Sequence, residues 1–382
     1  MKILADRAIP FLDPCFADLG EIIAVDGREI ESGRVRDTDV LLVRTVTRVD
    51  EPLLRGSRVR FVATPASGFD HVDVAYLAAA GIGFAHAPGC NARAVAEYAI
   101  AGLFALPRGI RRIPTGIRAG IVGLGHAGSA LASLLDALDI PHLDCDPPLA
   151  EAGCTGDWHE LADLRDADLV SLHVPFTATG PHPTRGLIGE EFLSAMPAGA
   201  MLVNMARGGI VEEQALRRRL ERRDGTRCIV DTWENEPDID VELLRNVDLG
   251  TPHVAGYSLD ARLRASVAVA RSLRQYLGLE RGFYPPVLPA PPDPEISIGK
   301  DTGDVDAVRQ AVLAACDIRG DAARLLRLAE LETAARPAFF ADLRNNYAVR
   351  REFTSYTVRL PGPAERLERM LRGLGFGVAR AG

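Results

Sequence analysis

A glycine-rich turn between an apolar run and a helical pattern constrains the fold of this chain more than any other feature. The apolar residues 121–122 lead into the turn at 123–128, and a helical pattern follows at 129–138. In a Gly-x-Gly-x-x-Gly turn, the first glycine permits a tight bend, the second lets a pyrophosphate approach the backbone, and the third lets the helix pack against the strand. The free N–H groups at the helix start then face the phosphates. The residues expected at a dinucleotide are Gly123, Gly125, His126, Ala127 and Gly128.

An acidic residue follows this turn at the spacing expected for a ribose contact. A second apolar run ends in Asp144-Cys145-Asp146, about 20 positions after the glycines. A carboxylate there hydrogen-bonds a ribose hydroxyl and disfavours a 2′-phosphate, so we expect NAD rather than NADP. Asp144 and Asp146 both fit the spacing, and Asp146 is preferred because it lies just past the strand. The glycines alone would also suit a plain surface turn, but the flanking strands and the acid favour dinucleotide binding.

Strand and helix patterns alternate over residues 1–100, which indicates a parallel sheet covered by helices on both faces. Ligands of such doubly wound sheets bind beyond the carboxyl ends of the strands. Arg44 and Thr45 follow the strand expected at 40–43, and Ser67 and Gly68 follow the strand expected at 61–64. The planar guanidinium of Arg44 matches a carboxylate or a phosphate, so Arg44 is a candidate anion clamp. A surface arginine paired with a nearby aspartate is the alternative.

The remaining patterns divide the chain further, and 382 residues suit two or three domains. A helix expected at 92–106 leads into a Pro- and Arg-rich connection at 107–118. The dinucleotide domain then extends to residue 255, and a helix expected at 260–277 returns to the first domain. A proline-rich linker at 285–294 precedes a third, smaller domain. Its expected elements are helices at 305–316, 321–334 and 364–374 and a strand at 354–360.

Charge and cysteine usage exclude several classes of protein. The net charge of −8 argues against a nucleic-acid partner. No uncharged apolar run reaches roughly 18 residues, so no membrane-spanning helix is expected, and the N-terminus has no signal-peptide apolar core. The six cysteines are scattered and form no Cys-x-x-Cys pair, so neither a metal site nor a disulfide framework is expected. A reducing, cytoplasmic setting follows, with the thiols mostly in the core.

Three charged residues, Arg207, Glu236 and His253, follow successive strands of the dinucleotide domain. Oxidation of an alcohol by NAD needs a base for the hydroxyl proton, and histidine suits this role near neutral pH. A neighbouring carboxylate orients the ring, and an arginine can bind a substrate carboxylate and polarise the developing carbonyl. Each residue alone could be a loop cap, a turn residue or a surface ion pair. Together, in one dinucleotide domain, they favour catalysis.

The order of these motifs resembles the D-isomer-specific 2-hydroxyacid dehydrogenases over residues 1–285. The resemblance rests on the glycine turn, Asp146, His173-x-Pro175, Asn204-x-x-Arg207-Gly208, Asp231-x-Trp233-x-x-Glu236-Pro237 and His253-x-x-Gly256-Tyr257. It implies an α/β fold with two doubly wound parallel-sheet domains. These are a flavodoxin-like catalytic domain, made of residues 1–100 and 256–285, and a Rossmann-type NAD domain at 107–255. It also implies that Arg207, Glu236 and His253 are catalytic, with His253 the proton donor or acceptor.

Further motifs are similar to one member of this family that acts on a phosphorylated substrate. They include Asp70-His71-Val72-Asp73, Gly180-Pro181-His182-Pro183-Thr184 and, near the C-terminus, Arg350-Arg351-Glu352-Phe353. This similarity implies NAD-dependent oxidation of 4-phospho-D-erythronate at C2. It also implies a homodimer formed through an α+β domain at residues 286–382. Arg350 and Arg351 are candidates to reach a partner subunit's cleft. The alternatives are another D-2-hydroxyacid dehydrogenase, such as one acting on 3-phosphoglycerate, and a non-catalytic NAD-sensing corepressor of the same fold.

The resemblance also implies individual ligand contacts. Those for the cofactor are Asp146, Val174, Met205, Ala206, Arg207, Asp231 and Gly256, beside the glycine turn. Those for the substrate are Arg44, Thr45, Ala66, Ser67, Gly68 and Tyr257. The chain departs from the family pattern at Ala66, where the family has threonine, and at Phe69, where it has a small polar residue. Ser67 is a candidate to supply the hydroxyl that Ala66 lacks.

Overall fold

The computed structural model describes residues 1–106, 116–279 and 282–380. The chain divides into two compact units, one made of Met1–Asn91 with Leu259–Pro289 and the other of Ala92–Ser258 with Ala290–Gly382. Most of the interdomain connection expected at 107–118 lies outside the described residues. The division into three domains, with boundaries at 100, 107, 256 and 286, stays a prediction. We describe the two units separately.

The first unit is built on a five-stranded parallel sheet in the order β2-β1-β3-β4-β5. This is the flavodoxin-like order. Its strands are β1 Lys2–Asp6, β2 Glu21–Val25, β3 Val40–Leu42, β4 Phe61–Ala63 and β5 Gly83–Ala85. Its helices are α1 Leu12–Phe16, α2 Ser32–Val35, α3 Glu51–Leu54, α4 Val74–Ala79 and α11 Leu259–Tyr276.

Both faces of this sheet are buried. Successive side chains of a strand point to opposite faces, so neighbouring residues of one strand join different apolar clusters. Ile3 and Ala5 of β1 join one apolar cluster together with Val269 and Leu273 of α11. Leu4, between them, joins a second cluster with residues of α3 and α4. Such double burial requires continuous apolar runs in the strands, which is why the sequence pattern identified them.

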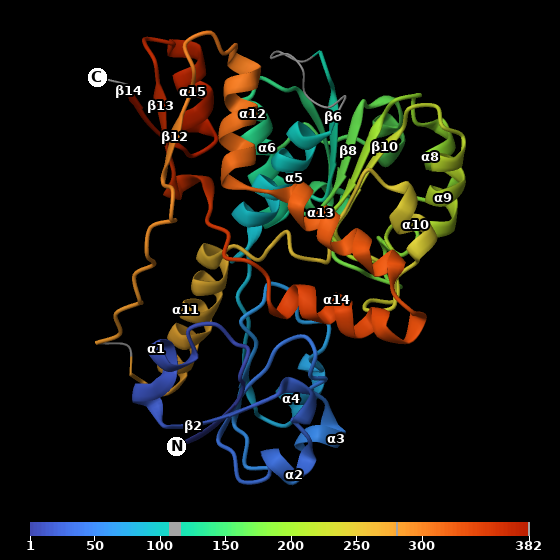
Figure 1. Ribbon diagram of the computed structural model, residues 1–382. Helices are drawn as coiled ribbons and strands as arrows, with labels where there is room; N and C mark the ends of the chain where they lie inside the picture. The colour runs from blue at the N-terminus through green and yellow to red at the C-terminus, as the bar shows by residue number, and fades with distance from the viewer. Residues whose placement is uncertain (107–115, 280–281, 381–382) are drawn as a thin grey trace. The chain divides into compact units, whose positions relative to one another are not determined.

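The second unit contains a six-stranded parallel sheet in the order β11-β10-β9-β8-β6-β7. Its strands are β6 Ala119–Val122, β7 His142–Cys145, β8 Leu169–Leu172, β9 Met201–Asn204, β10 Arg227–Val230 and β11 Leu249–Gly250. Its helices are α5 Ala92–Ala105, α6 His126–Ala137, α7 Pro147–Glu151, α8 Glu190–Ala195, α9 Glu213–Glu221 and α10 Val241–Asn246. Figure 1 shows α5 and α6 on one side of this sheet and α8 and α9 on the other. The strand order reverses at β6, and such switch points hold the ligands of doubly wound sheets.

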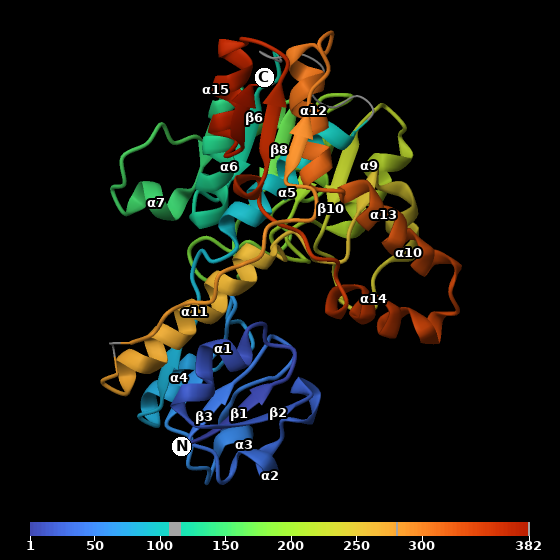
Figure 2. The same cartoon turned by 60° about the vertical axis from the view of Figure 1, so that its left-hand side comes forward.

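The C-terminal part of the second unit adds a small parallel sheet in the order β12-β13-β14. Its elements are β12 Glu295–Ser297, α12 Asp304–Ala315, α13 Ile318–Leu326, α14 Arg336–Asn345, β13 Thr357–Leu360, α15 Glu365–Gly373 and β14 Gly377–Arg380. Helix α15 packs beside α6 (Figure 2). Apolar residues of α12, α15 and β13 share one core cluster with residues of α5 and α6. The predicted fold class is therefore confirmed, with the third sheet packed onto α5 and α6.

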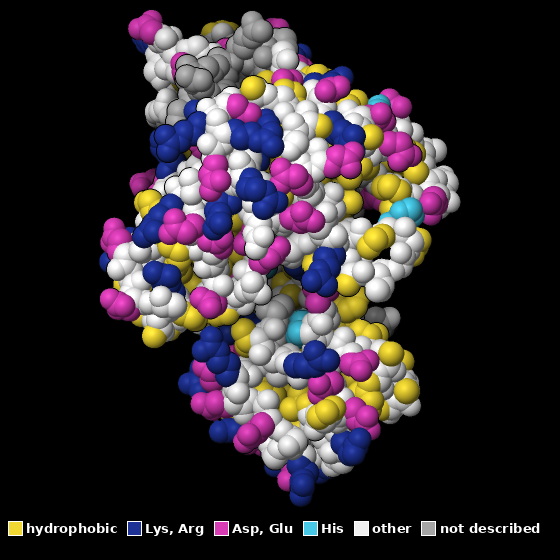
Figure 3. Space-filling model, turned by 90° about the vertical axis from the view of Figure 1, so that its right-hand side faces the viewer, with side chains coloured by type: hydrophobic (Ala, Val, Ile, Leu, Met, Phe, Trp, Pro, Cys, Tyr) yellow, Lys and Arg dark blue, Asp and Glu magenta, His cyan; other side chains and the backbone are white. Residues whose placement is uncertain are grey.

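The surface and the cysteines bear on possible partners. Cys154 is exposed and the other five cysteines are buried. Within the described ranges, no helix is long and apolar enough to cross a membrane, and no cluster of potential ligands could hold a metal ion. Basic and acidic side chains are interspersed on the face seen in Figure 3. Arg218 and Arg222 of the arginine-rich stretch at 217–223 both pair with Glu190.

A buried polar network ties α5 to the C-terminal part of the second unit. The Glu97 carboxylate accepts hydrogen bonds from Arg93 Nε at 2.6 Å and from the Phe353 backbone N–H at 2.9 Å. Next to it, the hydroxyls of Tyr98 and Tyr347 each donate to Asp321 Oδ2 at 2.7 Å. Glu97 is fully buried. Burial raises the pKa of Glu97 to about 7, although the charge of Arg93 opposes the rise.

This raised pKa makes a prediction about stability. The native state favours neutral Glu97. The contribution of Glu97 to the free energy of unfolding is therefore fully present below the ordinary carboxyl pKa and is lost as the pH rises through about 7. The loss is on the order of 3 kcal/mol. We expect Glu97→Gln to have a melting temperature close to that of wild type at pH 5. Between pH 5 and pH 8 the melting temperature of wild type should fall by several degrees more than that of the variant. Scanning calorimetry at both pH values measures this, with the exposed Glu332→Gln as control. A difference between variant and wild type that stays constant with pH would contradict the assignment.

Candidate active site

The glycine turn at the carboxyl end of β6 forms an open cradle. Gly123 has a φ of +90°, and a Cβ there would lie 2.7 Å from Val174 Cγ1. A Cβ on Gly128 would lie 1.9 Å from the Gly123 carbonyl oxygen, so this glycine is required for packing of α6. A Cβ on Gly125 would meet no described atom within 4 Å. This open space, at the N-cap of α6, is the room that a pyrophosphate needs in order to approach the backbone.

The first N–H groups of α6 are also suited to an anion. Helix α6 begins at His126, and its N-cap residue, Gly125, offers no side-chain hydrogen bond to the first N–H groups. The N–H groups of a first helical turn have no partner within the helix, and the helix dipole favours negative charge there. The cradle, the helix start and the topological switch point therefore coincide, and this fits the phosphates of a dinucleotide.

Asp146 lies beside the glycine turn. Its Oδ2 accepts a hydrogen bond from the Leu124 N–H at 2.7 Å, and its Oδ1 accepts one from the Leu149 N–H at 3.1 Å. Asp144 lies within β7, where its Oδ1 is 2.7 Å from His142 Nδ1. The geometry thus favours Asp146 as the ribose ligand, because its carboxylate lies beyond the carboxyl end of β7, where ligands of such sheets bind. The contact itself stays a prediction.

The other residues expected at the cofactor follow the neighbouring strands. Val174 follows β8, Met205, Ala206 and Arg207 follow β9, Asp231 follows β10, and Gly256 follows β11. Parallel strands bring all these segments to one edge of the sheet. Asp231 is fully buried, and it accepts hydrogen bonds from the N–H groups of Val254 and Ala255, both at 2.9 Å. Its carboxylate therefore fixes the loop that carries His253.

His253 and Glu236 form a hydrogen-bonded dyad. The Nδ1 atom of His253 lies 2.8 Å from Glu236 Oε2 and 3.1 Å from Oε1. Glu236 Oε1 also accepts from the Trp233 N–H at 2.9 Å, which fixes the carboxylate. His253 has a φ of +56°, a strained conformation that functional sites often retain. When Nδ1 donates its proton to Glu236, the Nε2 lone pair is available to a substrate.

The electrostatics of the dyad keep Glu236 ionised. Burial raises the pKa of this carboxyl group, but several neighbours lower it more. These are the charge and hydrogen bond of His253, the charge of Arg344 and the N–H of Trp233, so the net pKa lies below the ordinary value. An ionised carboxylate at Nδ1 stabilises a histidine that has accepted a proton at Nε2.

Arg207 lies on the loop after β9, next to the loop that carries Glu236. A Cβ on Gly208 would lie 1.9 Å from the Trp233 carbonyl oxygen, so the two loops are in contact. Arg207 Nη1 donates to the Ala206 carbonyl oxygen at 2.8 Å. Asn204 lies at the end of β9, and its Oδ1 accepts a hydrogen bond from the Ala206 N–H at 3.2 Å, which shapes this turn. The structure therefore brings together the loops of Arg207, Glu236 and His253.

Three residues of the C-terminal segment contact the loop at 253–258, and sequence reasoning did not predict this. Arg344 Nη2 donates to the Tyr257 hydroxyl at 3.0 Å, and Glu352 Oε1 accepts from Ser258 Oγ at 2.8 Å. Arg350 donates to the carbonyl oxygens of Val254 and Ala255. Arg350 is buried within its own chain, so the expectation that it reaches a partner's cleft is wrong. The spacing along the sequence carries no signal for these contacts.

The remaining predicted substrate contacts lie in the first unit. Arg44 and Thr45 follow β3, and Ala66, Ser67 and Gly68 follow β4; these two strands are neighbours in its sheet. Arg44 Nε donates to the buried Asp6 carboxylate at 2.8 Å. The structure therefore contains the pairing with an aspartate that was the alternative to an anion clamp. Ser67 Oγ is 3.4 Å from the Gly89 N–H. These residues gather at one sheet edge, and their contact with a substrate stays a prediction.

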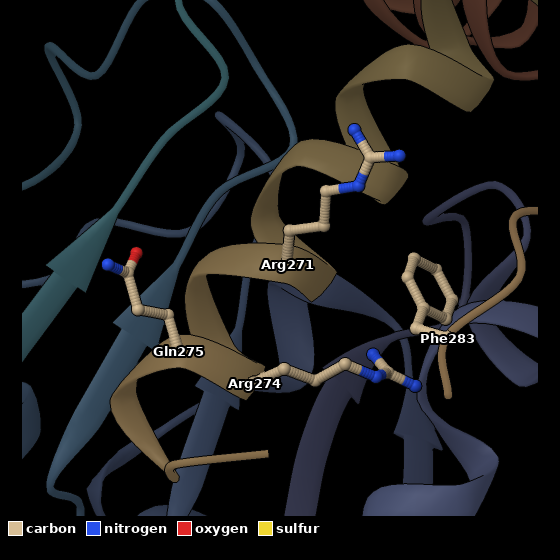
Figure 4. A pocket seen from close by; sticks show the side chains of 4 residues that line it. All are labelled: Arg271, Arg274, Gln275 and Phe283. Carbon is tan, nitrogen blue, oxygen red and sulfur yellow. The ribbon is translucent and has the colours of Figure 1, made fainter. Parts of the chain in front are cut away.

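A separate hollow lies on α11 in the first unit (Figure 4). Arg271, Arg274, Gln275 and Phe283 line it. The Arg274 guanidinium lies over the Phe283 ring, 3.9 Å from its centroid, and pairs with Asp18 at 2.6 Å. These contacts account for the charge of Arg274. None of the predicted site residues is among the four that line the hollow.

Comparison with known proteins places the chain in a family. Residues 108–255 match the family model of the D-isomer specific 2-hydroxyacid dehydrogenase NAD binding domain. The erythronate-4-phosphate dehydrogenase of Marinobacter nauticus is 42% identical over 381 residues, which are 98% of this chain and 99% of that protein. That of Escherichia coli O157:H7 is 40% identical over 360 residues, 94% of each chain. The chain belongs to the erythronate-4-phosphate dehydrogenase family. This confirms the resemblance inferred from the motifs and the expectation of NAD as cofactor.

Solved structures outside this family share the fold but match less of the chain. The D-lactate dehydrogenase of Aquifex aeolicus, complexed with NAD and lactic acid, has a TM-score of 0.60 and 23% identity and covers 73% of this chain and 96% of its own. The NAD+-bound 3-phosphoglycerate dehydrogenase of Entamoeba histolytica has a TM-score of 0.61 and covers 74% and 97%. Residues 287–375 match a separate family model, a domain of unknown function. The erythronate-4-phosphate dehydrogenase relatives, in contrast, match nearly the whole chain.

Two glycines of the cradle provide a matched test of cofactor binding. Gly125 has a φ of −65°, which alanine adopts without strain, and its Cβ would enter open space. We expect Gly125→Ala to keep the wild-type melting temperature but to raise the dissociation constant of NAD about tenfold or more, because the methyl group occupies the path of the pyrophosphate. We expect Gly128→Ala to lose about 3 kcal/mol or more of stability through its backbone clash.

Calorimetry and NADH fluorescence titration measure the two effects. An unchanged NAD affinity in Gly125→Ala would show that the phosphates bind elsewhere.

Proposed function

We propose that this chain oxidises the C2 hydroxyl of 4-phospho-D-erythronate with NAD. The product is (R)-3-hydroxy-2-oxo-4-phosphooxybutanoate, a precursor in pyridoxal 5′-phosphate biosynthesis. The near full-length identity to erythronate-4-phosphate dehydrogenases, at about two in five residues, is the observation that carries the substrate assignment. The Glu236–His253 dyad at the ligand edge of the sheet supports the type of reaction.

In this proposal His253 handles the proton. Its Nε2 accepts the proton of the C2 hydroxyl while the C2 hydride departs. Glu236, ionised and 2.8 Å from Nδ1, stabilises the imidazolium that forms and holds the ring in place. In the reverse direction the same imidazolium returns the proton to the carbonyl oxygen. Bound NAD supplies the acceptor for the hydride.

Arg207 binds the substrate carboxylate and polarises the oxygen on C2 as it becomes a carbonyl. Gly123, Gly125, His126, Ala127 and Gly128 hold the pyrophosphate of NAD, and Asp146 holds a ribose hydroxyl. Further cofactor contacts come from Val174, Met205, Ala206, Asp231 and Gly256. The buried Asp231 acts chiefly through the loop that it fixes.

Arg44, Thr45, Ala66, Ser67, Gly68 and Tyr257 bind the rest of the substrate. Ala66 can contribute only its backbone and its methyl group, and Ser67 supplies the nearest hydroxyl in the sequence. We further propose a cytoplasmic homodimer that forms through residues 286–382. This proposal rests on the resemblance to the family, and the match of residues 287–375 to a family model of their own is consistent with a separate module there.

The substrate assignment is tested by NADH formation with purified protein. We expect turnover with 4-phospho-D-erythronate and a kcat/KM at least about 100-fold lower with 3-phosphoglycerate and with D-lactate. Preference for 3-phosphoglycerate would assign the chain to another branch of the 2-hydroxyacid dehydrogenases. NAD binding without turnover of any of these hydroxy acids would favour a cofactor-sensing protein.

The dyad makes a separate prediction. We expect His253→Ala to lower kcat about 1,000-fold or more, because no base remains for the hydroxyl proton. We expect Glu236→Gln to lower kcat by about 100-fold or more, because the imidazolium loses its anionic partner. Both variants should bind NAD like wild type, as fluorescence titration would reveal. If His253→Ala instead loses NAD affinity while its kcat at saturating NAD is unchanged, His253 has a structural role.

A further inference from the structure

Arg344 lies in the last turn of α14 and reaches the proposed catalytic dyad. Its Nη1 is 3.8 Å from Glu236 Oε2, the oxygen nearest to His253 Nδ1. Its Nη2 donates to the Tyr257 hydroxyl at 3.0 Å, and the guanidinium carbon lies 5.7 Å from the centroid of the Tyr257 ring. A permanently charged group from the C-terminal segment thus stands between the dyad and a predicted substrate contact.

The donors of Arg344 are incompletely used. The guanidinium has five N–H donors. The hydrogen bond to Tyr257 uses one, and the Glu236 carboxylate lies beyond hydrogen-bond distance. The Nε atom is buried and has no acceptor among the described residues. The Arg344 side chain is 23% exposed, so the terminal N–H donors that Tyr257 does not use remain open to an acceptor that a ligand supplies.

The charges around Arg344 indicate what kind of ligand that is. Glu236 is the ionised group that pairs with it, and this carboxylate is already shared with His253. Arg344 therefore retains positive charge toward a further anion. The rigid fork of a guanidinium matches the oxygens of phosphate with two parallel hydrogen bonds.

Its position also separates this anion from the reacting carbon. Arg344 reaches the dyad through Glu236, on the Nδ1 side of the imidazole, whereas a substrate hydroxyl is held at Nε2. A group bound by Arg344 is thus displaced from C2, as the terminal phosphate of a four-carbon chain is. Arg207 is assigned to the carboxylate at C1.

The origin of Arg344 fits a role in substrate choice. Arg344 lies in the segment 287–375, which matches a different family model from the NAD binding domain. The fold neighbours leave about a quarter of this chain unmatched, a share similar in size to the segment after Pro289.

We propose that Arg344, together with the Tyr257 hydroxyl that it orients, binds the terminal phosphate of the substrate and so sets the preference for a phosphorylated 2-hydroxy acid. This inference rests on the proposed function. It assigns to the C-terminal segment a direct part in substrate recognition.

The test compares phosphorylated with unphosphorylated substrate in Arg344→Met, Arg344→Lys and wild type. We expect Arg344→Met to lower kcat/KM for 4-phospho-D-erythronate about 100-fold, mainly through KM, and to lower kcat/KM for D-erythronate at least about tenfold less, because only the phosphorylated substrate loses its anion contact. Arg344→Lys should recover part of the loss, because it keeps the charge but not the fork. Inorganic phosphate should inhibit wild type competitively against the substrate, and Arg344→Met should bind it at least tenfold more weakly.

Arg336→Met serves as the matched control, since Arg336 lies on the same helix and donates to the Leu331 carbonyl oxygen at 3.0 Å. Its kinetics should equal those of wild type. An equal loss of kcat/KM for both substrates in Arg344→Met would overturn the proposal, because it would mean that Arg344 acts only through Glu236 and Tyr257. Unchanged inhibition by phosphate would also overturn it. A wild-type protein that does not oxidise 4-phospho-D-erythronate would instead contradict the proposed function.

Discussion

The hydrogen bond between His253 and Glu236 is the interaction on which the functional interpretation depends. It joins two loops that follow different strands of the Rossmann sheet, so it exists only if both loops are held firmly. The loop of His253 is fixed from one side by the buried Asp231 carboxylate and from the other by Arg350, which donates to two of its carbonyl oxygens. The strained backbone of His253 is compatible with this support. The proposed catalytic geometry therefore depends on residues almost 120 positions apart in the sequence.

The C-terminal segment has a larger part in this support than its position in the chain suggests. Its helices share an apolar core with α5 and α6, and Glu97 of α5 accepts a hydrogen bond from the Phe353 backbone. Neighbouring residues Arg350 and Glu352 hold the loop at 253–258. A segment that packs onto α5 and α6 and also contacts the loop at 253–258 links the stability of the NAD-binding domain to the placement of His253, the proposed base.

Local features of the site could be predicted from the sequence, because each depends on a few consecutive residues. The glycine turn, the acid after β7 and the strand ends that carry Arg207, Glu236 and His253 are of this kind. Helix α6 begins at His126 rather than at the expected residue 129, because Gly125 caps it without the side-chain signal that marks most helix starts. The expected strand at 354–360 begins only at Thr357, because Phe353–Ser355 forms a 3₁₀ turn.

Features set by tertiary packing could not be predicted in this way. The short strands β12 and β14 have no extended apolar run, and α14 contains a proline near its start. Arg350 looked like a surface arginine available to a partner, but its burial against backbone carbonyls is decided by packing. Arg344 gave no sign of its contact with Glu236, which lies 108 positions away. Sequence patterns report local geometry well, while the partners of a buried charge follow from the whole fold.

The most direct measurement is a crystal structure of this protein with NAD and 4-phospho-D-erythronate bound. The account predicts that the oxygen on C2 lies within about 3 Å of His253 Nε2, with Glu236 still hydrogen-bonded to Nδ1. A substrate oxygen held by another side chain, with the His253 ring turned away from it, would contradict the account.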